Sequence, residues 1–140
     1  MPLILLAEDD PLVAELVCAA LEPRGYIVGV LPDGRGIVEI VQGKRPALVI
    51  LDCAMPIMGG IQALQLIRAS SIGFSVPVLM LTARSSFRDE DIARRAGATD
   101  YLRKPFDADQ LTATVDCLIS DALLPGTFLT PPVKMRGRYA

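Results

Sequence analysis

The sequence predicts an α/β domain in which a doubly wound parallel sheet of five strands is covered by helices on both faces. Two observations predict this class. Short apolar runs alternate with helix-like segments five times along the chain, which is the pattern of βα units with right-handed crossovers. The central run, Ala47–Leu51, is apolar without a break, and a strand of that kind is buried on both faces of a parallel sheet.

The first expected strand, Pro2–Ala7, ends at an acidic cluster. Asp10 followed by Pro11 predicts a helix start, because Asp caps free helical N–H groups and Pro is tolerated at the first helical position. This helix would end near Glu22. Its expected core face consists of Val13, Leu16, Val17, Ala20 and Leu21. Three flanking residues look poorly buried and belong either to an ordinary apolar helix or to a docking surface for a partner helix: Leu12, Cys18 and Ala19.

The middle of the chain continues the alternation. Tyr26–Leu31 is an apolar run closed by Pro32-Asp33-Gly34, and a weak helix is expected over Gly36–Gln42, before Gly43. After the central strand comes a loop rich in turn residues, Met55–Gly60. Ile61–Ala69 then predicts the third helix.

The last part of the chain supplies two further βα units. Val76–Leu81 predicts the fourth strand, and Phe87–Ala96 predicts a highly charged helix ended by Gly97. Asp100–Arg103 is a short fifth strand, and Asp107 caps a last helix that runs to about Leu123. We therefore expect one folded domain over residues 1–122. Residues 123–140 form a Pro-containing basic tail that we expect to be disordered or loosely docked.

Composition excludes several classes of protein. The chain has 140 residues, 51% of them hydrophobic, which suits one globular domain with its own core. The net charge of −2 argues against non-specific nucleic-acid binding. No histidine is present to bind a metal or act as a base, and the cysteines (Cys18, Cys53 and Cys117) are too far apart for a metal site. With no signal peptide and no apolar run long enough for a bilayer, we expect a cytoplasmic protein.

Polar residues stand at the ends of four expected strands. The first strand ends at Glu8 and Asp9, the third at Asp52, the fourth at Thr82 and the fifth at Lys104. The carboxyl ends of parallel strands lie at one edge of the sheet, where α/β folds bind ligands. An all-oxygen carboxylate cluster suits Mg²⁺, and a nearby hydroxyl and ammonium would favour a phosphoryl group.

Asp52 has two interpretations on its own. It either caps the turn after its strand or acts as a covalent phosphoryl acceptor, which needs no base because a carboxylate is already ionised at neutral pH. The convergence of the strand ends favours the second interpretation, since positioning and charge neutralisation supply most of the rate in phosphoryl transfer.

Over about residues 1–122 the chain resembles the receiver domain of two-component response regulators. The matching segments are Ile4–Pro11, Leu51–Pro56 with Met58 and Gly60, Leu81–Ala83 and the decapeptide Gly97–Phe106. Gly59 stands where this family often has Asp. The resemblance implies a flavodoxin-like (βα)5 fold with strand order 2-1-3-4-5.

The resemblance also implies roles for the strand-end residues. Asp52 would accept a phosphoryl group from a phosphohistidine of a histidine kinase or a histidine phosphotransfer protein. Asp9, Asp52 and the backbone carbonyl of Ala54 would bind Mg²⁺ (or Mn²⁺), with Glu8 acting through a water. The phosphoryl oxygens would be bound by Lys104, Thr82 and Ala83.

Further residues would switch or tune the phosphorylated state. Tyr101 resembles the family's switch aromatic, which turns inward as Thr82 moves, and the Lys104–Pro105 bond would be cis. Ala54 and Arg84 occupy the two positions that tune phosphoryl lifetime in this family. Our hypothesis is that Arg84 shields the acyl phosphate, the alternative being that it points into water.

These features predict a phosphorylation switch, not an enzyme beyond slow self-dephosphorylation. We expect a stand-alone receiver that signals through a downstream protein target, without direct contact to nucleic acid or membrane. One way to transmit the signal would be a homodimer that forms through Phe87–Ala96, the fifth strand and the last helix. The poorly buried residues Leu12, Cys18 and Ala19 would favour docking onto a helical bundle that carries the phosphohistidine.

Two other functions compete with this one. A phosphatase of the haloacid dehalogenase type would need a second Asp where Ala54 stands. A phosphorylation-independent interaction domain usually loses part of the acidic pair, the acceptor Asp or the Lys, and this chain keeps all of them.

Overall fold

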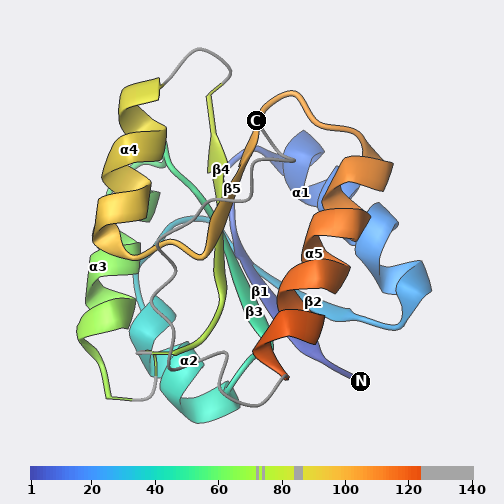
Figure 1. Cartoon of the computed structure of the whole chain (residues 1–140), viewed down its shortest axis with the longest axis horizontal. Coiled ribbons are helices and arrows are strands. Elements are labelled where there is room, and N and C mark those ends of the chain that lie inside the picture. The colour runs from blue at the N-terminus through green and yellow to red at the C-terminus, as the bar shows by residue number, and fades with distance from the viewer. Residues whose placement is uncertain (72, 74, 84–86, 124–140) are drawn as a thin grey trace.

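Five parallel strands form a single sheet in the computed structural model of the chain, in the order β2-β1-β3-β4-β5 (Figure 1). The structure describes residues 1–71, 73, 75–83 and 87–123. The strands are β1 (Leu3–Ala7), β2 (Ile27–Leu31), β3 (Leu48–Asp52), β4 (Val78–Thr82) and β5 (Asp100–Arg103). The helices are α1 (Pro11–Leu21), α2 (Ile37–Lys44), α3 (Gly60–Ala69), α4 (Phe87–Ala96) and α5 (Ala108–Ala122), with a 3₁₀ turn at Glu22–Arg24. The predicted fold and strand order are confirmed.

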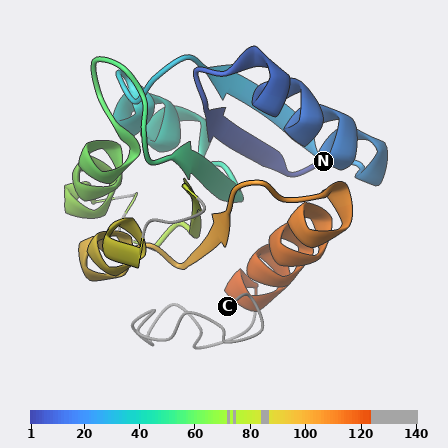
Figure 2. The same ribbon diagram turned by 90° about the horizontal axis from the view of Figure 1, so that it is seen from above.

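Each face of the sheet packs against its own set of helices (Figures 1 and 2). Successive side chains of a strand point to opposite faces, so Ile4 and Leu6 of β1 face α1 and α5, whereas Leu5 faces α2, α3 and α4. All residues of β3 and β4 are buried. The unbroken apolar runs in the sequence therefore correspond to the strands at the centre of the sheet.

The termini of three helices differ from the sequence expectation for local reasons. Helix α1 stops at Leu21, because Pro23 is accommodated in the 3₁₀ turn that follows. The sequence predicted that α2 ends before Gly43, and this is wrong. The helix continues to Lys44, and Arg45 closes it with a left-handed φ of 49°. Helix α3 begins one residue early, at Gly60.

The buried stripe of α1 also corrects the prediction. Val17 and Leu21 are buried as expected, and Ala14 is the third buried residue. Leu16 was assigned to the core face, and this is wrong, because it is 38% exposed. The helix packs against both α5 and the sheet along Ala14, Val17 and Leu21, which leaves Leu16 toward solvent.

No helix within the described residues has the length and apolar character that crossing a membrane requires.

Candidate functional site

Three carboxylates meet at the carboxyl edge of the sheet. Ala7 pairs with Leu51 across β1 and β3, so the residues that follow, Glu8 and Asp52, leave the two central strands side by side. Glu8 and Asp52 are buried, whereas Asp9 is exposed. One oxygen from each of Glu8, Asp9 and Asp52 lies within 4.8 Å of the others. The structure thus brings together the acidic residues that the sequence placed at separate strand ends.

Lys104 extends into this cluster from the end of β5. Its Nζ lies 3.1 Å from Glu8 Oε1 and 3.1 Å from Asp52 Oδ1. The backbone N–H of Lys104 donates to the carbonyl oxygen of Thr82 at 2.8 Å. The ammonium therefore contacts two of the three carboxylates, and the cluster keeps a surplus of negative charge.

The surplus negative charge shifts the pKa values of Glu8 and Lys104. Burial raises the pKa of Glu8 to about 7, and the hydrogen bond to Asp52 and the charge of that carboxylate act in the same direction. Burial lowers the pKa of Lys104, but its bonds to Glu8 and Asp52 outweigh this effect and raise the pKa overall. A cation bound among these oxygens would relieve the repulsion, and an all-oxygen donor set fits a hard divalent ion.

Thr82 supplies a buried hydroxyl beside the cluster. It is the last residue of β4 and is 0% exposed, and its Oγ1 has no hydrogen-bond partner among the described residues. A buried hydroxyl without a partner costs about 1–3 kcal/mol. An incoming ligand with acceptor oxygens would satisfy it. Ala83, the next residue, is exposed at the same edge.

The loop between β3 and α3 holds the backbone of Asp52 tightly. A Cβ at Gly60 would lie 2.2 Å from the carbonyl oxygen of Asp52, so only glycine fits there. The Gly60 N–H donates to the Cys53 carbonyl at 3.1 Å. Ile57 in this loop has a φ of 67° and is 72% exposed. A β-branched residue in the left-handed region is strained.

The remaining residues singled out in the sequence lie around this edge or on α1. Ala54 is exposed in the β3–α3 loop, Tyr101 is buried on the α4 side of the sheet, and the Lys104–Pro105 bond is cis. Leu12 is 74% exposed and Ala19 is exposed, whereas Cys18 is half-buried. Arg84 and residues 124–140 of the tail lie outside the described residues.

The response regulator receiver domain model matches residues 4–116 of the chain. The chain belongs to this family. A curated relative is the DNA-binding response regulator MtrA of Mycolicibacterium smegmatis, which is 38% identical over 112 residues, 80% of this chain and 48% of the relative. The receiver domain thus spans about half the length of that protein.

Solved structures show the same fold. A response regulator from Chloroflexus aurantiacus superposes with a TM-score of 0.81 at 28% identity, over 85% of this chain and 98% of that one. The receiver domain of the sensor histidine kinase PA1611 from Pseudomonas aeruginosa has a TM-score of 0.78 at 32% identity, over 85% and 98% of the two chains. That receiver contains a magnesium ion coordinated in its active site cleft.

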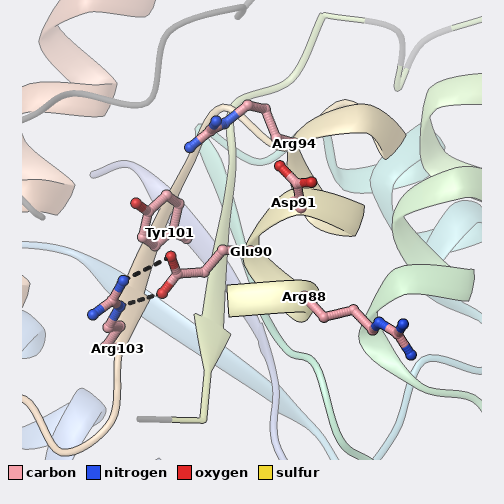
Figure 3. Close-up of a pocket in the computed structure, with 6 residues that line it drawn as sticks. All are labelled: Arg88, Glu90, Asp91, Arg94, Tyr101 and Arg103. Atoms are coloured by element: carbon pink, nitrogen blue, oxygen red, sulfur yellow. Dashed lines mark hydrogen bonds and ion pairs between the residues drawn. The ribbon is translucent and has the colours of Figure 1, made fainter. Parts of the chain in front are cut away.

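One feature of this receiver domain was not predicted from its sequence. The sequence predicted α4 as a highly charged helix and singled out no buried acid in it, but Glu90 is buried and forms an ion pair with Arg103 of β5 (Figure 3). A signal was present, because Glu90 precedes the buried Ala93 by three residues and so shares its side of the helix.

Proposed function

We propose that this receiver domain is a phosphorylation switch in which Asp52 is the phosphoryl acceptor. The observation that supports the proposal best is the position of Lys104, with Nζ 3.1 Å from Asp52 Oδ1, in a cluster that has excess negative charge. An aspartyl phosphate needs a cation on its oxygens, and Lys104 is already held there.

The transfer requires little from the protein besides position and charge. A carboxylate oxygen of Asp52 forms a bond to phosphorus while the bond from phosphorus to the donor, the imidazole nitrogen of a phosphohistidine, breaks. Lys104 then pairs with the phosphoryl oxygens, and the Thr82 hydroxyl and the backbone of Ala83 donate to them. Thr82 gains in this state the hydrogen bond it lacks among the described residues.

The cation that fits this cluster is Mg²⁺, with Mn²⁺ as the alternative. Asp9, Asp52 and the carbonyl of Ala54 would hold it, and Glu8 would act through a water. When bound, the ion neutralises the carboxylates and the charge of the phosphoryl group. The magnesium ion reported in the cleft of the PA1611 receiver supports this assignment.

The test is the intact mass of the protein after incubation with acetyl phosphate. We expect a gain of one phosphoryl group that requires Mg²⁺ and is lost in Asp52→Asn. No gain in the wild-type protein with Mg²⁺ would contradict the proposal and favour a phosphorylation-independent interaction domain. Multiple turnover of a phosphate ester would instead indicate an enzyme.

The phosphoryl donor in the cell would be a histidine kinase or a histidine phosphotransfer protein that docks on α1. Leu12, Leu16 and Ala19 are all exposed, and their spacing of four and three residues places them on one side of the helix. This stripe begins two residues after Asp10, next to the acidic cluster. Leu16 therefore replaces the half-buried Cys18 in the docking surface expected from the sequence.

The variant Leu12→Asp distinguishes an effect on docking of the donor protein from an effect on phosphorylation itself. We expect slower phosphotransfer from the donor protein, because the apolar contact is lost, and an unchanged rate from acetyl phosphate. Leu66→Asp is the matched control, since Leu66 is 43% exposed on α3. Equal slowing with both donors would argue against this docking surface.

A downstream protein would read the phosphorylated state, and a homodimer through α4, β5 and α5 is one form that the output would take. Size-exclusion chromatography with light scattering, before and after phosphorylation, tests the dimer. An unchanged monomer mass would direct the search to a different protein target.

A further inference from the structure

The Glu90–Arg103 ion pair joins α4 to β5 through two hydrogen bonds. Arg103 Nη2 donates to Glu90 Oε1 at 2.9 Å, and its Nε donates to Glu90 Oε2 (Figure 3). A guanidinium that binds both oxygens of a carboxylate is fixed in direction as well as in distance. The Glu90 side chain is 6% exposed and that of Arg103 is 32% exposed, so the carboxylate is shielded from water while the guanidinium keeps partial contact with it.

The pair is one of the contacts that attach α4 to the sheet. Among the α4 residues whose burial the structure describes, only Glu90 and Ala93 are buried. Ala93 contributes a single methyl group to the core, which is a small apolar contact. Among the α4 side chains that the structure describes, the ion pair with Arg103 is therefore the polar contact to β5 that accompanies this small apolar one.

Arg103 is also joined to the residues that would bind the phosphoryl group. It pairs with Thr82 in the register of β4 and β5, and it directly precedes Lys104. The Lys104 N–H donates to the Thr82 carbonyl at 2.8 Å. Paired residues of parallel neighbours point to the same face, so Thr82, Arg103 and the buried Tyr101 share the α4 side of the sheet.

We propose that Glu90 and Arg103 are positioning residues for phosphoryl acceptance at Asp52, an inference that rests on the proposed function. By holding the end of β5 against α4, the ion pair keeps the Thr82 hydroxyl and the Lys104 ammonium where they meet the phosphoryl oxygens. Without the pair the end of β5 is free to shift, and both groups move away from the acceptor. The two residues touch neither phosphoryl group nor donor and act through Thr82 and Lys104.

The experiment compares the rate of phosphorylation by acetyl phosphate in Glu90→Gln, Arg103→Gln and the double variant, at saturating Mg²⁺. A misplacement of about 1 Å costs on the order of a hundredfold in rate, and we expect a smaller loss, on the order of tenfold, in each single variant, because the binding groups themselves are kept. The double variant should be no slower than the slower single variant, because two residues that act as one contact are not additive. The saturated rate should fall, not the concentration of acetyl phosphate at half-saturation.

Asp91→Asn is the matched control. Asp91 is adjacent to Glu90 and pairs with Arg95 at 3.8 Å, but both side chains are exposed. Loss of this surface pair should leave the rate unchanged. Arg103→Lys keeps the charge but loses the two-point contact, so its rate should lie between those of wild type and Arg103→Gln, and it remains informative if the glutamine variants fold poorly.

The outcomes separate this inference from the function on which it rests. Wild-type rates in folded Glu90→Gln, a faster rate, or additive losses in the double variant would overturn the positioning role while leaving phosphorylation intact. Lower thermal stability with an unchanged rate would likewise overturn it and show a structural contact only. If wild type itself accepts no phosphoryl group, the proposed function fails, and this inference fails with it.

Discussion

At Asp52 a carboxylate occupies the last position of a strand that is otherwise apolar, and two more carboxylates lie within reach. In the absence of a cation the side chains of Glu8 and Asp9 repel it, whereas the ammonium of Lys104, 3.1 Å from Asp52 Oδ1, attracts it. The site therefore has unfavourable electrostatic energy that a bound cation relieves. Conformational strain is present beside it, at Ile57.

Asp52→Asn should stabilise the cation-free domain. The change removes the charge of Asp52 from the carboxylate cluster and keeps the shape of the side chain, and we expect a gain of about 1 kcal/mol in the free energy of unfolding. Urea unfolding at neutral pH in a chelator measures it. Added Mg²⁺ should stabilise wild type more than the variant, because binding to the folded state adds to stability. Lower stability of Asp52→Asn in the chelator would contradict this view of the cluster.

Ile57→Asn should also stabilise the domain. Asn adopts the left-handed region more readily than a β-branched residue, and relief of strain of this kind is worth about 1 kcal/mol. The side chain is exposed, so little packing is lost. Ile57→Val keeps the branched Cβ and should bring no gain in the same urea titration. Equal stability of all three proteins would show that the backbone at 57 carries no strain.

At the scale of elements, two neighbouring helices contain glycines in opposite surroundings, one without room for a side chain and one in open space. Gly60 begins α3 directly against the backbone of Asp52, whereas Gly43 lies in the last turn of α2 with nothing within 4 Å of where its Cβ would be. The first glycine is required by a close approach of two backbones. The second has no contact that requires it.

Gly60→Ala and Gly43→Ala should therefore change stability in opposite directions. Overpacking against Asp52 should cost about 1–3 kcal/mol in Gly60→Ala and slow phosphorylation, because the acceptor backbone moves. Gly43→Ala should add about 0.5–1 kcal/mol, since alanine is the better helix former. Thermal unfolding by circular dichroism compares the two. A stable Gly60→Ala with normal phosphorylation would show that the loop adapts without moving Asp52.

At the scale of the whole molecule, one cluster joins the early and late parts of the chain. Asp116 of α5 accepts a hydrogen bond from the Tyr26 hydroxyl at 2.6 Å and pairs with Arg24 of the 3₁₀ turn. Burial raises the pKa of Tyr26 to about 12, and the Asp116 bond and charge act in the same direction. The folded state thus favours the neutral phenol.

This contact should give the domain a specific dependence on alkaline pH. The pKa of Tyr26 is higher in the folded than in the unfolded chain, so its contribution is complete below about pH 10. It is lost as the pH rises through about 12. Tyr26→Phe should be about 1 kcal/mol less stable than wild type at pH 8, with a smaller difference at pH 11. A difference that does not change with pH would show that Asp116 does not hold the phenol.

The family and the fold were determined by the sequence alone, because their signals are local. Unbroken apolar runs identify central strands, Asp10 and Asp107 identify helix starts, and strand ends converge in any parallel sheet. The composition of the acidic cluster follows from the same patterns, and the contacts of Lys104 with Glu8 and Asp52 show that the strands meet as expected.

Only the tertiary structure decided which face of each helix is buried and which charges pair. Leu16 is exposed and Ala14 is buried because α1 packs against α5, and Glu90 is buried because Arg103 of β5 lies opposite it. The i, i+3 spacing to Ala93 places Glu90 on the buried side of α4, but its partner Arg103 and the rotation of α1 against α5 are contacts between distant segments, which periodicity does not reveal. Likewise, the lack of a partner for the Thr82 hydroxyl among the described residues is a property of the assembled sheet edge. The physical reason is that burial and pairing are set by the neighbouring elements in space.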